Sequence, residues 1–171
     1  MTIEAFKKEV LPLKNRLYRL ALRLLIDRME AEDVVQDVFM KLWSKRNQLQ
    51  QYRSIEAFAM VITKNKCFDI LKSKRYKIMD GLSADLSVNH MSPYSYAENA
   101  DSIDHVLALI NKLPELQKVI IHLRDVEGYD FDEIAEITEL NMNAVRVNLS
   151  RARKNVREGL IKVNKYELYE N

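Results

Sequence analysis

Asp33 and Asp37 are the first candidates for chemistry, because side chains four positions apart share one face of a helix. Such a pair could hold Mg²⁺ in a helical prenyl-transferring enzyme. That chemistry needs a second acidic helix facing the first, and the sequence has no second cluster of this kind. The pair therefore favours an acidic surface over a metal centre, and that surface is either merely solvated or a docking patch for a partner. We expect no metal and no cofactor.

The remaining residues with ligand or nucleophile chemistry are isolated from one another. His90, His105 and His122 show no ligand spacing with each other or with acids. Cys67 is the only cysteine, so it can form neither an internal disulfide nor a cysteine-pair metal site. These observations favour a non-enzymatic protein of a reducing cytoplasm.

Basic residues, by contrast, gather in two blocks. Residues 64–77 hold six cations against one acid, and residues 141–157 hold five cations and no acid. Between the blocks, residues 80–104 hold five acids and no lysine or arginine, although the whole chain carries a formal net charge of only +2. Two basic blocks on either side of an acidic segment predict two surfaces that bind one polyanion.

The second basic block follows a predicted helix-turn-helix. Asp130 and Glu133 have the spacing of a capping box, which predicts that a short helix begins there. Ala135 is small enough for a second helix to approach closely, and Asn141 is a suitable N-cap for that second helix. The pattern therefore predicts two unequal helices joined by a tight turn.

The longer second helix has an apolar face and a polar, basic face. Four apolar residues of this helix lie within about 60° of one another around its axis and are expected to face the core: Val145, Leu149, Ala152 and Val156. The opposite face and its flanks hold Asn143, Arg146, Val147, Ser150, Arg151, Arg153, Lys154 and Arg157. Arginine can read guanine in the major groove, and asparagine or serine can reach base edges. Together with the turn, this favours a DNA-reading helix over a merely solvated basic face.

Composition and periodicity predict an all-α protein of two small helical domains. The chain has 171 residues, 47% of them hydrophobic, with only 3 glycines and 3 prolines. Helical spacing holds up to about residue 76, breaks down over residues 80–101, and resumes at Ser102, a plausible N-cap. We expect domains over residues 1–78 and 102–171, joined by a flexible acidic linker over residues 79–101. No apolar run approaches the roughly 20 residues that span a bilayer, so no membrane insertion is expected.

A third stretch, Ala31–Trp43 (AEDVVQDVFMKLW), predicts a helix whose apolar side leaves an acidic and amide patch outside. Together with Phe58–Arg75 (FAMVITKNKCFDILKSKR) and VRVNLSRARK over residues 145–154, it resembles the sigma factors of bacterial RNA polymerase. The resemblance is to the extracytoplasmic-function (ECF) group of the sigma-70 family. It covers nearly the whole chain, with three motifs in the family's order.

This resemblance implies a protein that binds core RNA polymerase and promoter DNA and directs transcription initiation. The N-terminal domain would be sigma2-like and the C-terminal domain sigma4-like, with the β′ clamp and the β flap as their polymerase contacts. The expected polymerase-binding residues are Glu32, Asp33, Gln36, Asp37 and Met40. An anti-sigma factor is a further partner that the resemblance implies, since many relatives have one.

The resemblance also implies two sets of DNA-binding residues. Those expected at the −10 element are Phe58, Lys64, Asn65, Lys66, Lys72, Lys74 and Arg75, with Asn65 receiving an unpaired base. Those expected at the −35 element are Arg124, Asn143, Arg146, Val147, Ser150, Arg151 and Lys154. Cations along the opened strand agree with the way proteins hold single-stranded nucleic acid.

Four positions depart from the family's pattern. Asn148 and Ser150 replace residues that are often basic or aromatic, so the −35 sequence preference cannot be read from them. Phe58 stands where tryptophan is commonest, and Glu139 occupies a turn position that usually holds glycine. Residue 139 must therefore adopt a negative φ or accept backbone strain. The alternative function is a stand-alone helix-turn-helix regulator that binds an operator as a dimer without polymerase.

Overall fold

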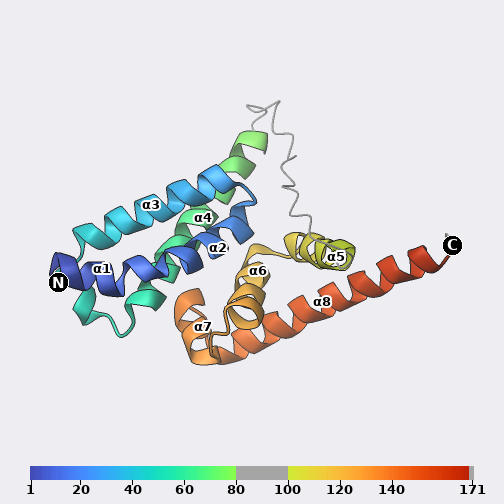
Figure 1. The fold of residues 1–171 in the computed structure, drawn as a ribbon. Coiled ribbons are helices and arrows are strands. Elements are labelled where there is room, and N and C mark those ends of the chain that lie inside the picture. Colours follow the sequence, from blue (N-terminus) through green and yellow to red (C-terminus); the bar gives the residue numbers. More distant parts are fainter. Residues whose placement is uncertain (80–99, 170–171) are drawn as a thin grey trace. The chain divides into compact units, whose positions relative to one another are not determined.

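A computed structural model of the chain describes residues 1–79 and 100–169, and every regular element among them is helical (Figure 1). The predicted all-α fold is therefore confirmed. The chain divides into two compact units, Met1–His90 and Met91–Asn171. Most of the predicted linker, residues 79–101, lies outside the described residues.

The first unit begins with α1 (Ile3–Glu9), the short 3₁₀ turn η1 (Leu11–Leu13) and α2 (Lys14–Leu25). Then come α3 (Arg28–Ser44), the turn η2 (Leu49–Gln51) and the long helix α4 (Ile55–Met79). The Asp27 carboxylate accepts a hydrogen bond from the Glu30 N–H at 2.9 Å, so α3 begins with a polar N-cap.

The core of the first unit forms where α2 packs against both α3 and α4. Leu17, Leu20 and Leu24 of α2, which are spaced three and four positions apart, are buried on one face of this helix. Val34, Val38 and Leu42 of α3 are buried as well. One face of α3 and part of α4 are thereby fixed, and their remaining faces are left to solvent.

The second unit contains α5 (Ala100–Asn111), α6 (Glu115–Ile121), the π-helical segment η3 (His122–Val126), α7 (Phe131–Thr138) and α8 (Met142–Tyr169). Gly128, at φ +77°, supports the reversal between η3 and α7. Val145, Leu149 and Ala152 of α8 are buried, as predicted, together with Ile134 and Ile137 of α7. Val156, predicted on the same face of α8, is only partly buried.

Helix α5 begins two residues earlier than predicted, at Ala100 rather than after a Ser102 cap. The prediction was wrong because alanine has the highest helix propensity, so Ala100 extends the helix toward its N-terminus past Ser102. Farther along, α5 packs against α8. None of the helices in the described part of the chain combines the length and apolar character that a bilayer crossing demands.

Candidate functional site

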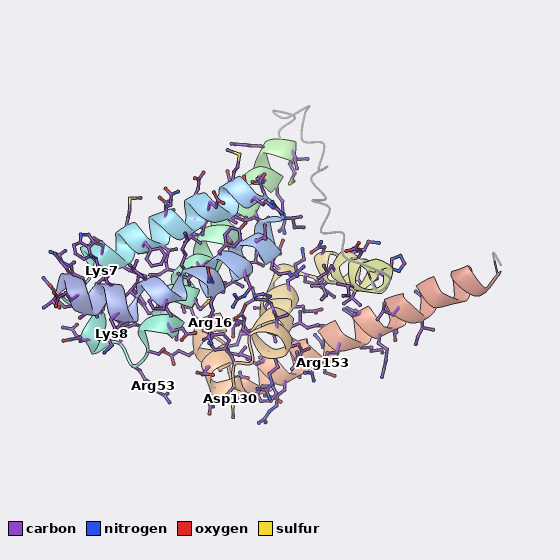
Figure 2. The ribbon with its side chains drawn as sticks, viewed as in Figure 1. Lys7, Lys8, Arg16, Arg53, Asp130 and Arg153 are labelled. Carbon is purple, nitrogen blue, oxygen red and sulfur yellow. The ribbon has the colours of Figure 1, made fainter. Side chains whose placement is uncertain are left out.

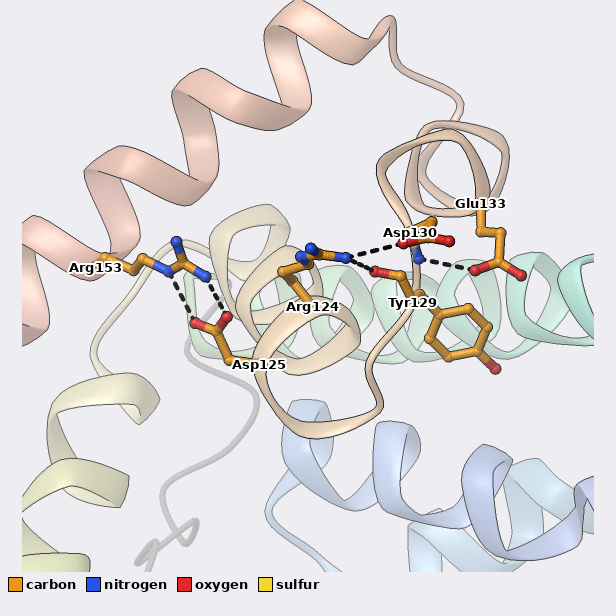
Figure 3. Close-up of polar contacts among 6 residues, drawn as sticks. All are labelled: Arg124, Asp125, Tyr129, Asp130, Glu133 and Arg153. Carbon is orange, nitrogen blue, oxygen red and sulfur yellow. Dashed lines mark hydrogen bonds and ion pairs between the residues drawn. The ribbon is translucent and has the colours of Figure 1, made fainter.

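The helix-turn-helix of the second unit is built by the capping interactions that the sequence predicted. Asp130 and Glu133 form a capping box, in which the Asp130 N–H donates to the Glu133 carboxylate at 2.8 Å (Figure 3). The Asn141 side chain accepts a hydrogen bond from the Ala144 N–H at 2.8 Å and starts α8. These two caps fix where α7 and α8 begin, and hence which side chains α8 presents.

Helix α8 presents its polar face around an open groove. The groove has a volume of about 420 Å³ and is lined by Phe131, Arg146, Leu149, Ser150, Arg153, Lys154 and Arg157. Four of these side chains are cationic, so the groove suits an anionic partner. The predicted residues Asn143, Arg146, Val147, Ser150, Arg151 and Lys154 are all exposed, and they come from one stretch of this helix.

Arg124, which was also predicted to contact the −35 element, lies just before the helix-turn-helix. Its Nη1 donates to the Tyr129 carbonyl at 2.7 Å and lies 3.3 Å from Asp130 Oδ1 (Figure 3). Its guanidinium carbon lies 4.8 Å from the centre of the Phe131 ring. Arg124 is therefore oriented by three groups of the turn that leads into α7.

Arg153 of α8 forms a two-pronged ion pair with Asp125 of η3. Its Nε and Nη2 donate to the two carboxylate oxygens at 3.1 and 2.5 Å (Figure 3). The hydrogen bonds that the Arg153 guanidinium donates to Asp125 raise its pKa. The contact joins α8, where Figure 2 labels Arg153, to the segment that carries Arg124. The pair therefore ties α8 to η3 beside the groove that Arg153 lines.

The acidic patch on α3 has the exposure that a docking surface needs. Glu32, Asp33, Gln36 and Met40 are exposed, and Met40 keeps 62% of its surface open to solvent. Asp37 is only partly exposed and forms an ion pair with Lys66 of α4. Glu30 pairs with Lys74 of α4 at 2.6 Å. Two residues predicted to bind DNA are thus paired with acids of α3.

The predicted −10 residues on α4 differ in exposure, and three of them, Phe58, Lys66 and Lys74, are only partly exposed. Asn65, Lys72 and Arg75 are exposed. Lys64 is only 4% exposed, so its predicted contact with the strand backbone disagrees with the structure. The charge block in the sequence included Lys64, but this residue lies on the α4 face that also carries the buried Met60 and Cys67.

Tyr52 is a candidate residue that the sequence did not single out. Its ring stacks on Phe58 at 3.8 Å between centroids, with 18° between the ring planes. Phe58 and Asn65 are seven residues apart, about two helical turns, so they share one face of α4. The sequence does place Tyr52 six positions before Phe58. Tyr52 precedes α4, however, so helical periodicity could not predict that the two rings meet. Phe131 and Asp125 were also missed, because their contacts join separate elements.

The described part of the chain offers no cluster of three or more His, Cys, Asp or Glu residues that could hold a metal. The pKa of the Cys67 thiol is raised to about 12, mainly by burial and in smaller part by the nearby Glu30. Such a thiol is a poor nucleophile at neutral pH. The chemistry available at these surfaces is therefore charge pairing, hydrogen bonding and stacking.

Comparison with known proteins gives two family matches in chain order. The family model described as Sigma-70 region 2 matches residues 10–76, and that described as Sigma-70, region 4 matches residues 103–156. The chain is 31% identical over 150 residues to the RNA polymerase sigma factor SigV of Bacillus subtilis, covering 87% of each chain. It is 30% identical over 163 residues to the probable RNA polymerase sigma factor RfaY of Xanthomonas campestris pv. campestris. That match covers 92% of this chain but only 41% of the longer relative.

The fold is also similar to a solved structure, that of the sigma factor RpoE in complex with the anti-sigma factor NepR from Bartonella quintana. The TM-score is 0.75 at 24% sequence identity, over 92% of this chain and 98% of that one. At this level of identity the likeness concerns the fold alone.

Proposed function

This chain belongs to the sigma-70 family, in its extracytoplasmic-function group, and we propose that it binds core RNA polymerase and directs it to promoter DNA. The observation that carries the proposal is the exposed basic face of α8, buried on its other side and started by a polar cap. We further propose that the protein catalyses no reaction and acts in the cytoplasm. Its work is then to place two promoter elements in register on the polymerase.

The proposed docking surface for polymerase is the acidic patch on α3. Three acidic or amide side chains and Met40 lie on the exposed side, opposite the buried valines. A charged rim around an exposed apolar side chain is a common composition for a protein interface. The partner surfaces proposed are the β′ clamp for this patch and the β flap for the second unit.

The two DNA sites are proposed on different units. Asn65 and Phe58 share one face of α4, and the Tyr52 ring stacks on Phe58. Together these side chains would hold unpaired bases of the −10 element. Lys66, Lys72, Lys74 and Arg75 would follow the strand backbone. Arg146 and its neighbours on α8 would read the −35 element in the major groove. The proposed domains are residues 1–78 and 102–171, with a linker over residues 79–101.

The structure calls for a specific design when this proposal is tested. Reversing the charge of Asp37 would change the docking patch and also break its ion pair with Lys66. Asp33 is exposed and takes no part in the ion pairs seen in residues 1–79. Asp33→Arg therefore tests the patch alone, and Glu9→Arg, at an exposed position of α1, is a matched charge-reversal control.

The measurement is the affinity of the full chain for bacterial core RNA polymerase. We expect Asp33→Arg to weaken binding by about tenfold or more, because it places a like charge in a complementary interface. The exchange Asp37→Lys with Lys66→Glu keeps the intramolecular pair and should weaken binding as well. Unchanged affinity in both variants, beside a tight parent, would place docking elsewhere. A folded parent that does not bind core polymerase would overturn the proposed function.

An anti-sigma factor is a further proposed partner. The solved structure with the similar fold is itself a complex of a sigma factor with an anti-sigma factor. The stand-alone regulator is not favoured, because both sigma-70 regions are matched in family order.

A further inference from the structure

Phe131, the first residue of α7, lies between two arginines that come from different elements. The guanidinium carbon of Arg124, in η3, is 4.8 Å from the ring centre. That of Arg146, in α8, is 5.3 Å from the same centre. Both distances are within the range of a cation–π contact. One ring therefore touches two cations that the proposed function assigns to the −35 element.

The ring is itself held firmly in place. The residue before it, Asp130, donates its N–H to Glu133 at 2.8 Å in the capping box and accepts from Arg124 at 3.3 Å. The residue before that, Tyr129, accepts a second hydrogen bond from Arg124 at 2.7 Å. These contacts hold the backbone that leads into position 131, so they limit where the half-buried Phe131 ring can lie.

Arg146 depends on this ring more than Arg124 does. Arg124 donates hydrogen bonds to Tyr129 and Asp130 in addition to its contact with the ring. For Arg146, the contact seen with the described side chains of the second unit is the one with the Phe131 ring. A long exposed arginine otherwise samples many rotamers, and ordering it on binding costs affinity. Because Phe131, Arg146 and Ser150 line the same groove, the ring can hold the guanidinium where a base edge would lie.

We propose that Phe131 is a positioning residue that orders the Arg146 guanidinium for reading the −35 element. This inference rests on the proposed function and deepens it, because it names a specificity determinant that need not touch a base. Arg124 on the same ring would share the effect on affinity. If Phe131 were only a half-buried apolar side chain, an aliphatic residue of similar size would replace it without consequence for base choice.

The test uses the full chain with core RNA polymerase and a promoter DNA library randomised over the upstream and downstream elements. The parent, Phe131→Leu and Phe131→Tyr are compared by the bases selected at each position and by affinity for the parent's preferred sequence. We expect Phe131→Leu to lose about fivefold in affinity and to relax the base preference at the Arg146 position. Phe131→Tyr keeps the aromatic face and should behave like the parent.

The Arg146→Ala background separates a positioning role of Phe131 from a merely structural one. In that background, Phe131→Leu should leave the base preference unchanged, because the side chain that it positions is gone. Thermal unfolding checks that each variant is folded, and Phe131→Met replaces Phe131→Leu if the leucine variant is not.

Two failures are distinguishable. A parent that selects no upstream bases overturns the proposed function. A parent that selects them, beside a folded Phe131→Leu with the same preference and affinity, overturns the positioning role alone.

Discussion

Within residues 1–79 and 100–169, two residues other than glycine hold the left-handed backbone conformation that glycine usually takes. Ile26, after α2, has φ +58°, and Glu139, after α7, has φ +60°. The Glu139 N–H donates to the Glu136 carbonyl at 3.3 Å and the Leu140 N–H donates to the Ala135 carbonyl at 3.1 Å. This pair of bonds is the Schellman arrangement that ends a helix. The sequence predicted either a negative φ or strain at Glu139, and the structure shows the strained alternative.

Glu139→Gly should therefore stabilise the protein. Glycine adopts this conformation without a steric cost, and we expect the free energy of unfolding to rise by about 0.5–1 kcal/mol, less whatever entropy the unfolded chain gains. Urea denaturation of the full chain measures the change. Glu136→Gly, at an exposed position inside α7, is the matched control and should lower stability by about 1 kcal/mol. A loss of stability in both variants would show that the turn gains nothing from glycine.

Cys67 gives a prediction that depends on pH. Burial raises the pKa of its thiol from 9.0 to about 12 in the folded chain. The folded state therefore keeps its proton where the unfolded state loses it. This contribution to stability is complete below about pH 9 and declines as pH rises toward about 12. At pH 8 we expect iodoacetamide to modify the urea-unfolded chain rapidly and the native chain very slowly, as followed by mass spectrometry. Equal rates would mean that the thiol is accessible in the native state.

Single residues differ in how well the sequence predicts their role. The caps at Asp130 and Asn141 were predictable, because a cap depends on residues within three positions along the chain. The burial of Lys64 was not, because it depends on which faces of α4 are covered by α2 and α3. The same reason hid Phe131, whose two arginine contacts come from elements on either side of α7.

At the scale of elements, Gly159 shows why a helix can need a glycine in its interior. A Cβ at this position of α8 would lie 2.4 Å from Leu109 Cδ2 and 3.2 Å from Leu109 Cγ of α5. Glycine inside a helix costs roughly 1 kcal/mol relative to alanine. The close packing of α5 against α8 offsets that cost, since it holds α5 within the second unit.

Gly159→Ala sets these two effects against each other. Overpacking costs typically about 1–3 kcal/mol, more than the helix propensity that alanine restores, so we expect a net loss of about 1 kcal/mol. In a Leu109→Ala background the obstructing side chain is gone, and the same substitution should become stabilising. Urea denaturation of the four chains gives the cycle. A stabilising effect in both backgrounds would mean that Leu109 moves aside without cost.

The long, strongly periodic elements were the predictable ones. Val145, Leu149 and Ala152 of α8 are buried as expected, because the spacing along one helix face determines their burial. Val156, farther along the same face, is only partly buried. The start of α5 was misplaced by two residues, since serine is only one of several ways to begin a helix. The ion pairs from α3 to α4 were not predictable, because they join residues as far apart in sequence as Glu30 and Lys74.

At the scale of the whole molecule, the two proposed DNA sites lie on separate units of one chain. Each site alone offers only a few contacts, so the isolated protein should bind promoter DNA weakly. Core polymerase would hold both units on one scaffold, and linkage then raises the effective concentration of the second site. Sequence specificity would therefore be expressed by the complex with polymerase rather than by the chain alone.

The salt dependence of that complex separates phosphate contacts from base contacts. Lys154 is exposed on α8 and is proposed to meet a phosphate, so each such contact should add about 0.9 to the slope of log K against log salt. Lys154→Ala should weaken binding to every promoter by a similar factor and lower the slope by about that amount. Lys7→Ala, at an exposed position of α1 labelled in Figure 2, is the matched control and should leave the slope unchanged.

Arg146→Ala should instead weaken binding to preferred upstream sequences more than to others. If Lys154→Ala altered base choice and left the slope intact, its side chain would be reading bases, and the proposed division along α8 would be wrong.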